Sequence, residues 1–241
     1  MTQTEGKTDH SPESTARLII SSALLTGLCV GGTLSFPFWY GLGLYYAPAS
    51  TREQLTGYLS PDLTSDFWLQ GVVLGGIVWG LALGRLSNVW PLWRLGLAGG
   101  IGAFLAEVIA THPFFLGLHR ALWPDAPAHI RWAMDLVFGI GLGGGLMALA
   151  IGLAIRWERR AIWLALGVIP VAAIPALIVD LVLDAIGIRW GAGNANMAKV
   201  VGLAFPCSTI STGALIGWYL AKFGVHPKKE SDMIQERNTL S

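Results

Sequence analysis

Long apolar runs separated by short polar segments make up most of the chain. Each run is about 18 residues or longer, the length at which a helix crosses about 30 Å of hydrocarbon. A lone strand cannot satisfy its backbone hydrogen bonds in lipid, so every run is expected to be helical. The pattern predicts an all-α membrane protein, a six-transmembrane-helix bundle, with spans at 18–42, 67–84, 95–117, 132–155, 161–188 and 197–221.

The two ends of the chain are polar and mixed in charge. Residues 1–16 and 224–241 are interpreted as disordered cytoplasmic tails, because such segments bury too little apolar surface to offset the entropy of ordering. The longest loop, 43–66, is too short to hold a separate domain. Residues 17–223 are therefore predicted to form one bundle.

The basic residues are distributed unequally between the two sides of the predicted bundle. Cytoplasmic loops carry an excess of Lys and Arg, which sets the orientation of the spans. One side carries eleven of them and the other carries five, namely Arg52, Arg120, Arg131, Arg189 and Lys199. This bias places both termini in the cytoplasm, and a bacterial cytoplasmic membrane is the expected location. Most tryptophans fall near predicted span ends, as amphipathic rings do at headgroups, and Trp79 is the one placed mid-span.

Composition excludes several classes of function. Hydrophobic residues make up 53% of the chain and charged residues 13%, against about 25% charged in soluble domains. The net charge of +1 offers no basic surface for nucleic acid. The two cysteines show no metal or redox spacing, and GxSxG, HExxH and nucleotide loops are absent. An enzyme is therefore disfavoured, and the sequence identifies no cofactor.

Glycine is frequent, with 31 residues, and it recurs at helical spacing. Small residues allow close approach of helix backbones in lipid, where no hydrophobic force drives association. Two explanations stay open: packing within the chain, or docking of the glycine faces of spans two and four against a membrane-protein partner or a second copy. The glycines concerned are Gly71, Gly75, Gly76, Gly80 and Gly84, and Gly139, Gly141, Gly143, Gly144, Gly145 and Gly152.

Ionisable residues inside the predicted spans are candidate functional groups, because burying them in lipid is costly. Asp180 and Asp184 lie four apart and so share a helix face. One interpretation pairs Asp180 with Lys199 as a structural ion pair. The other joins the two aspartates to Glu107 and His112 as an outward-facing ion or proton site. These groups, with Asp135 as a further ion-pair candidate, all fall in the outer half of the predicted bundle.

Two further patterns carry weaker hypotheses. His112, His119 and His129 could gather a metal at the outer surface, although their spacing matches no established metal motif. In FPCSTIST (residues 205–212), Pro206 interrupts the helix, and Ser208 and Thr209 follow it. Broken helices coordinate ions in transporters, whereas in ordinary bundles hydroxyls simply satisfy the released backbone groups.

Three functional hypotheses follow from these patterns. The first, favoured by short loops and a compact bundle, is a non-enzymatic accessory or structural subunit that docks with other membrane proteins. The second is a small-ion or proton-coupled transporter that uses Glu107, Asp180 and Asp184. The third is a membrane-embedded enzyme with a histidine and acid site at the outer side.

Overall fold

The computed structural model of the chain describes residues 12–36, 43, 46–48, 50, 61–89, 91–111, 124–125, 127–155, 158–188 and 194–223. Throughout these ranges the regular structure is helical and no strand occurs, so the all-α class is confirmed. The long helices are α1 (Pro12–Thr26), which continues through the π-helical segment η1 (Gly27–Gly31) to residue 36, and then α4 (Pro61–Leu86), α5 (Leu92–Thr111), α7 (Ala128–Ala154), α8 (Glu158–Ala185) and α9 (Asn194–Phe223).

Four of these helices are long and apolar enough to cross a membrane. They cover Pro12–Phe36, Leu69–Leu86, Arg159–Ala185 and Lys199–Phe223. The two other long helices are α5 and α7, and within α7 the segment Phe138–Ala154 is a shorter apolar helix. The structure thus supports four candidate spans, and the count of six stays a prediction.

The first helix begins earlier than the sequence pattern predicted. The sequence pattern predicts a disordered tail over residues 12–16, whereas α1 starts at Pro12. Proline is favoured in the first turn of a helix because its missing N–H would have no partner there. Glu13 adds a negative charge at the positive end of the helix dipole. These two local signals outweigh the polar character of the segment.

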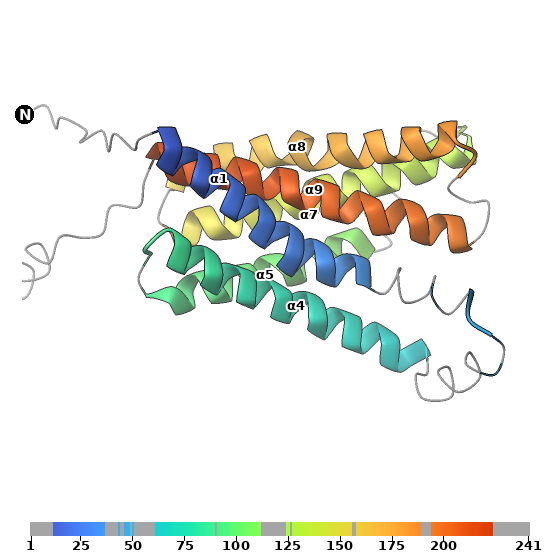
Figure 1. The fold of residues 1–241 in the computed structure, drawn as a ribbon, viewed down its shortest axis with the longest axis horizontal. Coiled ribbons are helices and arrows are strands. Elements are labelled where there is room, and N and C mark those ends of the chain that lie inside the picture. The colour runs from blue at the N-terminus through green and yellow to red at the C-terminus, as the bar shows by residue number, and fades with distance from the viewer. Residues whose placement is uncertain are drawn as a thin grey trace, which may run out of the picture.

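Successive helices run antiparallel and pack side by side (Figure 1). α4 packs on α5, α5 on α7, α7 on α8, and α8 on α9. α1 then packs against both α9 and α4, which closes the bundle. Its direction is opposite to that of α9, because Gly217 lies beside Ile19 whereas Gly31 lies beside Pro206. The start of α1 and the end of α9 consequently lie at the same end of the bundle (Figure 1).

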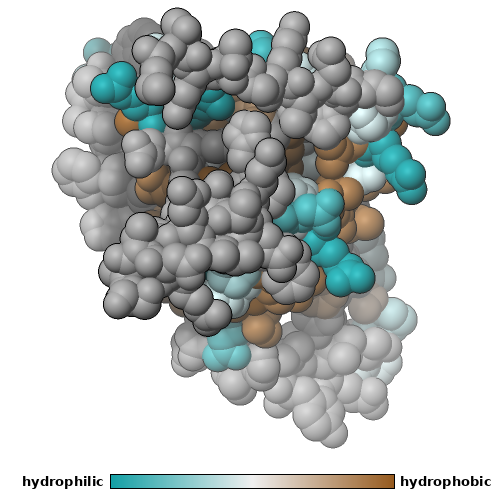
Figure 2. Space-filling model, turned by 90° about the vertical axis from the view of Figure 1, so that its left-hand side faces the viewer, coloured by the Kyte–Doolittle hydropathy of each residue, from teal (hydrophilic) through white to brown (hydrophobic). Residues whose placement is uncertain are grey.

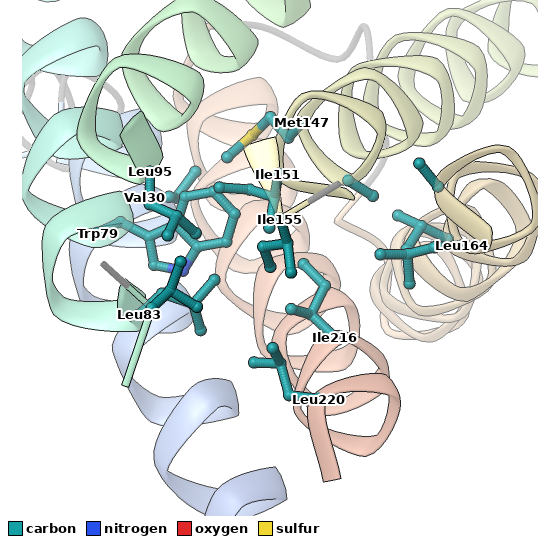
Figure 3. Packing of buried hydrophobic residues seen from close by; sticks show 14 of the residues in the cluster. Val30, Trp79, Leu83, Leu95, Met147, Ile151, Ile155, Leu164, Ile216 and Leu220 are labelled. Atoms are coloured by element: carbon teal, nitrogen blue, oxygen red, sulfur yellow. The ribbon is translucent and has the colours of Figure 1, made fainter. Parts of the chain in front are cut away.

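An apolar core fills the centre of this arrangement. Figure 3 shows Trp79 of α4 facing Met147 and Ile151 of α7, with Val30 and Ile216 nearby. The indole nitrogen of Trp79 donates a buried hydrogen bond of 2.8 Å to the hydroxyl of Thr26. That hydroxyl in turn donates to the carbonyl oxygen of Ser22 at 2.7 Å. The tryptophan thus joins α1 and α4 inside the bundle.

Glycines of α4 and α7 make their close contacts within the chain. A β-carbon at Gly75 would lie 2.6 Å from the carbonyl oxygen of Cys29, and one at Gly80 would overlap the carbonyl oxygen of Leu95. In α7, a β-carbon at Gly152 would lie 2.6 Å from that of Ala161 in α8. By contrast, Gly71 has nothing within 4 Å of its β-position. Most of the glycine positions predicted as docking faces are thus already occupied by neighbouring helices.

Candidate functional site

Two irregular helix segments meet where α1 packs on α9. The π-helical segment η1 places Gly31 so close to α9 that a β-carbon there would lie 3.1 Å from the Cα of Pro206 and overlap the hydroxyl of Thr209. Pro206 lies within α9, where its ring cannot donate a backbone hydrogen bond. π-Helical turns inside α-helices are often found at functional sites. The junction of η1 with α9 is therefore a candidate functional site.

The hydroxyls that follow the proline bond back to their own helix. Thr209 Oγ1 donates to the carbonyl oxygens of Phe205, at 2.8 Å, and Pro206, at 3.1 Å. Ser211 Oγ donates to the carbonyl oxygen of Cys207 at 2.9 Å. Such bonds are what an ordinary proline kink requires. They occupy the donor of Thr209, which was a predicted ion-site residue.

Two other hydroxyls of α9 lie on a different face and are deeply buried. Ser208 is 1% exposed and Thr212, one turn later, is 3% exposed. Among the described residues, neither Ser208 Oγ nor Thr212 Oγ1 has a hydrogen-bond partner. The Thr212 hydroxyl lies 3.6 Å from the β-position of Gly144 in α7. A buried hydroxyl without a partner costs free energy. These two hydroxyls are therefore the candidates for a functional role in the segment after Pro206.

Glu107 of α5 lies at about the same depth as these hydroxyls. It is 7% exposed. Its chain neighbour Ala106 packs against Gly143, with its β-carbon 3.2 Å from the β-position, and Gly144 is the glycine that meets Thr212. α7 therefore contacts α5 next to Glu107 and α9 at Thr212 at nearly the same level. A buried carboxyl at this depth can hold a proton or form a helix-to-helix hydrogen bond.

The two aspartates of α8 lie apart from Glu107. α8 packs on α7 and α9, whereas α5 packs on α4 and α7, so α7 stands between them. Ala173 of α8 contacts Gly141 of α7, and Asp180 lies two turns beyond Ala173. At 1.5 Å per residue, the level of Asp180 is about 12 Å from that of Glu107 along α7. Asp180 is half-buried and Asp184 is exposed, so this arrangement does not gather the three carboxylates.

The remaining predicted site residues contribute less. Lys199 is half-buried, and its Nζ lies 5.9 Å from the ring centroid of Tyr46. Asp135 and His129 belong to α7, with only their backbone described. His112 and His119 lie outside the described residues. Within the part of the chain that the structure describes, no three His, Cys, Asp or Glu side chains are close enough to hold a metal.

Sequence reasoning did not identify the hydrogen bond between Trp79 and Thr26 or the buried hydroxyl of Ser22. One signal for the first was available, since Trp79 was the only tryptophan placed mid-span. A buried indole N–H needs an acceptor, and Thr26 lies at matching depth on the first span.

Comparison of the chain with protein-family models, with curated proteins and with solved structures finds no match.

Proposed function

We propose that this chain is a six-span integral membrane protein with both termini in the cytoplasm, and that it serves as a non-enzymatic accessory subunit docked on other membrane proteins. Four helices already have the length and hydropathy of spans. α5 has 20 residues and α7 has 27, and about 20 helical residues cross the hydrocarbon core. The strictly antiparallel succession of helices supports the same topology.

The separation of Glu107 from the two aspartates of α8 is the observation that carries the subunit role. Glu107 is divided from Asp180 by the whole width of α7 and about two helical turns. The hydroxyls of Thr209 and Ser211 donate hydrogen bonds to backbone carbonyl oxygens of their own helix. A transport path that uses all these groups needs them in one chamber. Polar side chains that bond within or between neighbouring helices instead stabilise the bundle.

The outer face of α8 is the surface that we expect to meet a partner. Its exposed residues are large and apolar, for example Trp163 at 68%, Ile178 at 54% and Leu181 at 59% exposed. Such a face can pack against a helix of another membrane protein as well as against lipid.

Purification in mild detergent tests the proposal. The chain is expected to co-migrate with a partner at fixed stoichiometry. Ile178→Trp should release that partner by steric overlap, while Leu24→Trp on the outer face of α1 should not. The two positions are equally exposed, at 54% and 56%, so the control matches in burial and chemistry. A chain that purifies alone, or loses its partner equally with both variants, would contradict the subunit role.

A second candidate function rests on the depth shared by Glu107, Ser208 and Thr212. An acid that is 7% exposed lies level with two hydroxyls of α9 that have no partner among the described residues. Carboxyl and hydroxyl oxygens bind protons and small hard cations. In this variant of the ion hypothesis, Asp180 and Asp184 play no direct role.

Proton and cation flux into liposomes distinguishes this candidate from the first. If Glu107 carries the ion, Glu107→Gln should reduce flux by about tenfold or more, because general acid and base groups contribute at least that much. Asp184→Asn is the control, since Asp184 is exposed at the far end of α8. Both variants must elute and melt as the parent does. Unchanged flux in Glu107→Gln, or a wild-type chain without flux, would exclude the ion role.

A further inference from the structure

A second polar cluster lies at the end of the bundle where α8 begins and α9 ends. The guanidinium carbon of Arg160 lies 4.7 Å from the ring centroid of Phe223. The ammonium nitrogen of Lys222 lies 5.5 Å from the same centroid. Two cations from different helices thus converge on one aromatic ring. Arg94, at the start of α5, provides a contrast, because it lies over Trp93 of its own helix, at 5.8 Å.

Aromatic rings hold these cations in place. Lys222 Nζ also lies 4.5 Å from the Trp218 ring. Trp218 and Tyr219 stack edge to face at 5.3 Å, and Tyr219 lies 5.2 Å from Phe223. Cation–π contacts attract a charged group to the ring face and orient it. The positions of both charges are therefore set by the packing of the last turn of α9 rather than by flexible side chains alone.

The start of α8 adds further positive potential. Arg159 is exposed and precedes Arg160 in the first turn of the helix. The first turn of a helix is the positive end of its dipole and has backbone N–H groups without helical partners. Two consecutive arginines therefore lie where the helix dipole is already positive. The region as a whole favours a bound anion.

Apolar residues adjoin the cluster on the outside of the bundle. Trp163, one turn after Arg160, is among the most exposed large side chains, and Ile162 is exposed beside it. Figure 2 shows this end of the molecule, where hydrophilic side chains project at the rim and hydrophobic ones lie beside them. A ligand that suits both surfaces has an anionic head and an apolar tail.

We propose that Arg159, Arg160 and Lys222 bind the phosphate of an anionic phospholipid, with its acyl chains along Ile162 and Trp163. The inference rests on the membrane topology proposed above, which puts this end at the cytoplasmic leaflet. Basic pockets between spanning helices on that side bind anionic headgroups. The aromatic rings hold the cations at the headgroup level, where such rings gather.

Native mass spectrometry and lipid titration of the purified full chain test this proposal with dioleoyl phosphatidylglycerol as the probe. The wild-type chain should retain this lipid in preference to dioleoyl phosphatidylcholine. The double substitution Arg160→Gln and Lys222→Gln should weaken phosphatidylglycerol binding by at least about tenfold, given what each basic residue contributes near an anionic surface. Arg94→Gln should change it less than about threefold, because Arg94 is the one cation among the described residues that lies over the Trp93 ring.

Equal loss in the double variant and in Arg94→Gln would overturn the proposal, since it would indicate a diffuse charge effect. Competition by millimolar inorganic phosphate without phosphatidylglycerol selectivity would also overturn it, because the site would then serve a free anion. Resistance of each variant to carbonate extraction from membranes reports separately on its integration into the bilayer. A chain that stays in the membrane but ignores phosphatidylglycerol refutes the lipid site alone.

Discussion

The contact between α4 and α5 differs in kind from the contact between α8 and α9. At the first, glycines bring the two backbones together: β-carbons at Gly80 or Gly99 would overlap the carbonyl oxygens of Leu95 and Gly76. At the second, side chains fill the gap. Ala176 and Leu183 of α8 meet Val200, Val201 and Ala204 of α9, and a β-carbon at Gly167 would lie 3.6 Å from Leu215, an ordinary contact.

This difference separates a rigid part of the bundle from an adjustable one. A backbone-to-backbone contact cannot relax around an added methyl group, because carbonyl groups have no rotamers. A contact between side chains can repack at modest cost. The contact of α8 with α9 can therefore be altered more easily than the close contact of α8 with α7 at Gly152. α8 is also the helix on which partner docking is proposed.

Gly80→Ala is expected to have the largest effect, because it tests the close backbone contact between α4 and α5. The added methyl would strike the Leu95 carbonyl, and we expect the free energy of unfolding to fall by about 3 kcal/mol. Thermal unfolding in detergent measures the loss. Gly71→Ala in the same helix is the control, because open space surrounds that β-position, and its effect should stay within about 0.5 kcal/mol. Equal losses would mean that close approach at Gly80 is not the cause, because alanine by itself favours the helix over glycine.

Thr26→Val tests the contact between α4 and α1. It removes the acceptor of the Trp79 indole while keeping the side-chain volume, so the buried N–H loses its partner. The expected loss is about 1–2 kcal/mol, the range for buried hydrogen bonds inside membrane bundles. Thr26→Ser retains the hydroxyl and should recover most of the stability. If valine costs no stability, the hydrogen bond does not contribute. If serine costs as much as valine, the γ-methyl contact contributes as much as the bond.

Gly167→Ala tests the looser contact between α8 and α9. The position has room for a methyl group, and alanine favours the helix by up to about 1 kcal/mol over glycine. We expect a small gain in stability, opposite in sign to the effect of Gly80→Ala. Thermal unfolding under the same detergent conditions provides the measurement. A loss similar to that of Gly80→Ala would show that α8 and α9 also approach too closely for side chains.

Leu181→Ala should have the smallest effect. The side chain is 59% exposed, and truncation there should change the free energy of unfolding by about 0.5 kcal/mol or less. Leu164→Ala on the same helix, fully buried in the core, should cost about 3 kcal/mol. The pair measures how strongly burial along α8 determines stability. Similar costs at both positions would indicate that the α8 outer face is covered in the isolated chain.

The helical class followed from the sequence because the need to satisfy backbone hydrogen bonds acts on each segment separately. Within the described residues, each of the six predicted runs overlaps a long helix, although the ends shift, most clearly at Pro12. Residues 37–42 and 112–117 of the first and third runs lie outside the described ranges. Element boundaries depend on local capping and on contacts between helices, which hydropathy does not record. The number of spans depends on where each helix ends, so hydropathy determines it less directly than it determines the all-α class.

The candidate site was less predictable. Depth can be read from position along a span, and Glu107 and Thr212 do lie at one level of α7. The face that each side chain presents to its neighbours depends on which helices pack together. That pairing puts α7 between Glu107 and Asp180 and leaves Asp184 exposed. The spacing of residues in one helix cannot reveal this.

The sequence by itself determined the helices, their order and the positions where side chains are small or charged, because these follow from hydropathy and residue size along each segment. Only the tertiary structure decided which glycines face a backbone, which hydroxyls lose contact with water, and which cations share a ring. Those properties belong to pairs of helices, and the free energy of each depends on a neighbour far away in the chain.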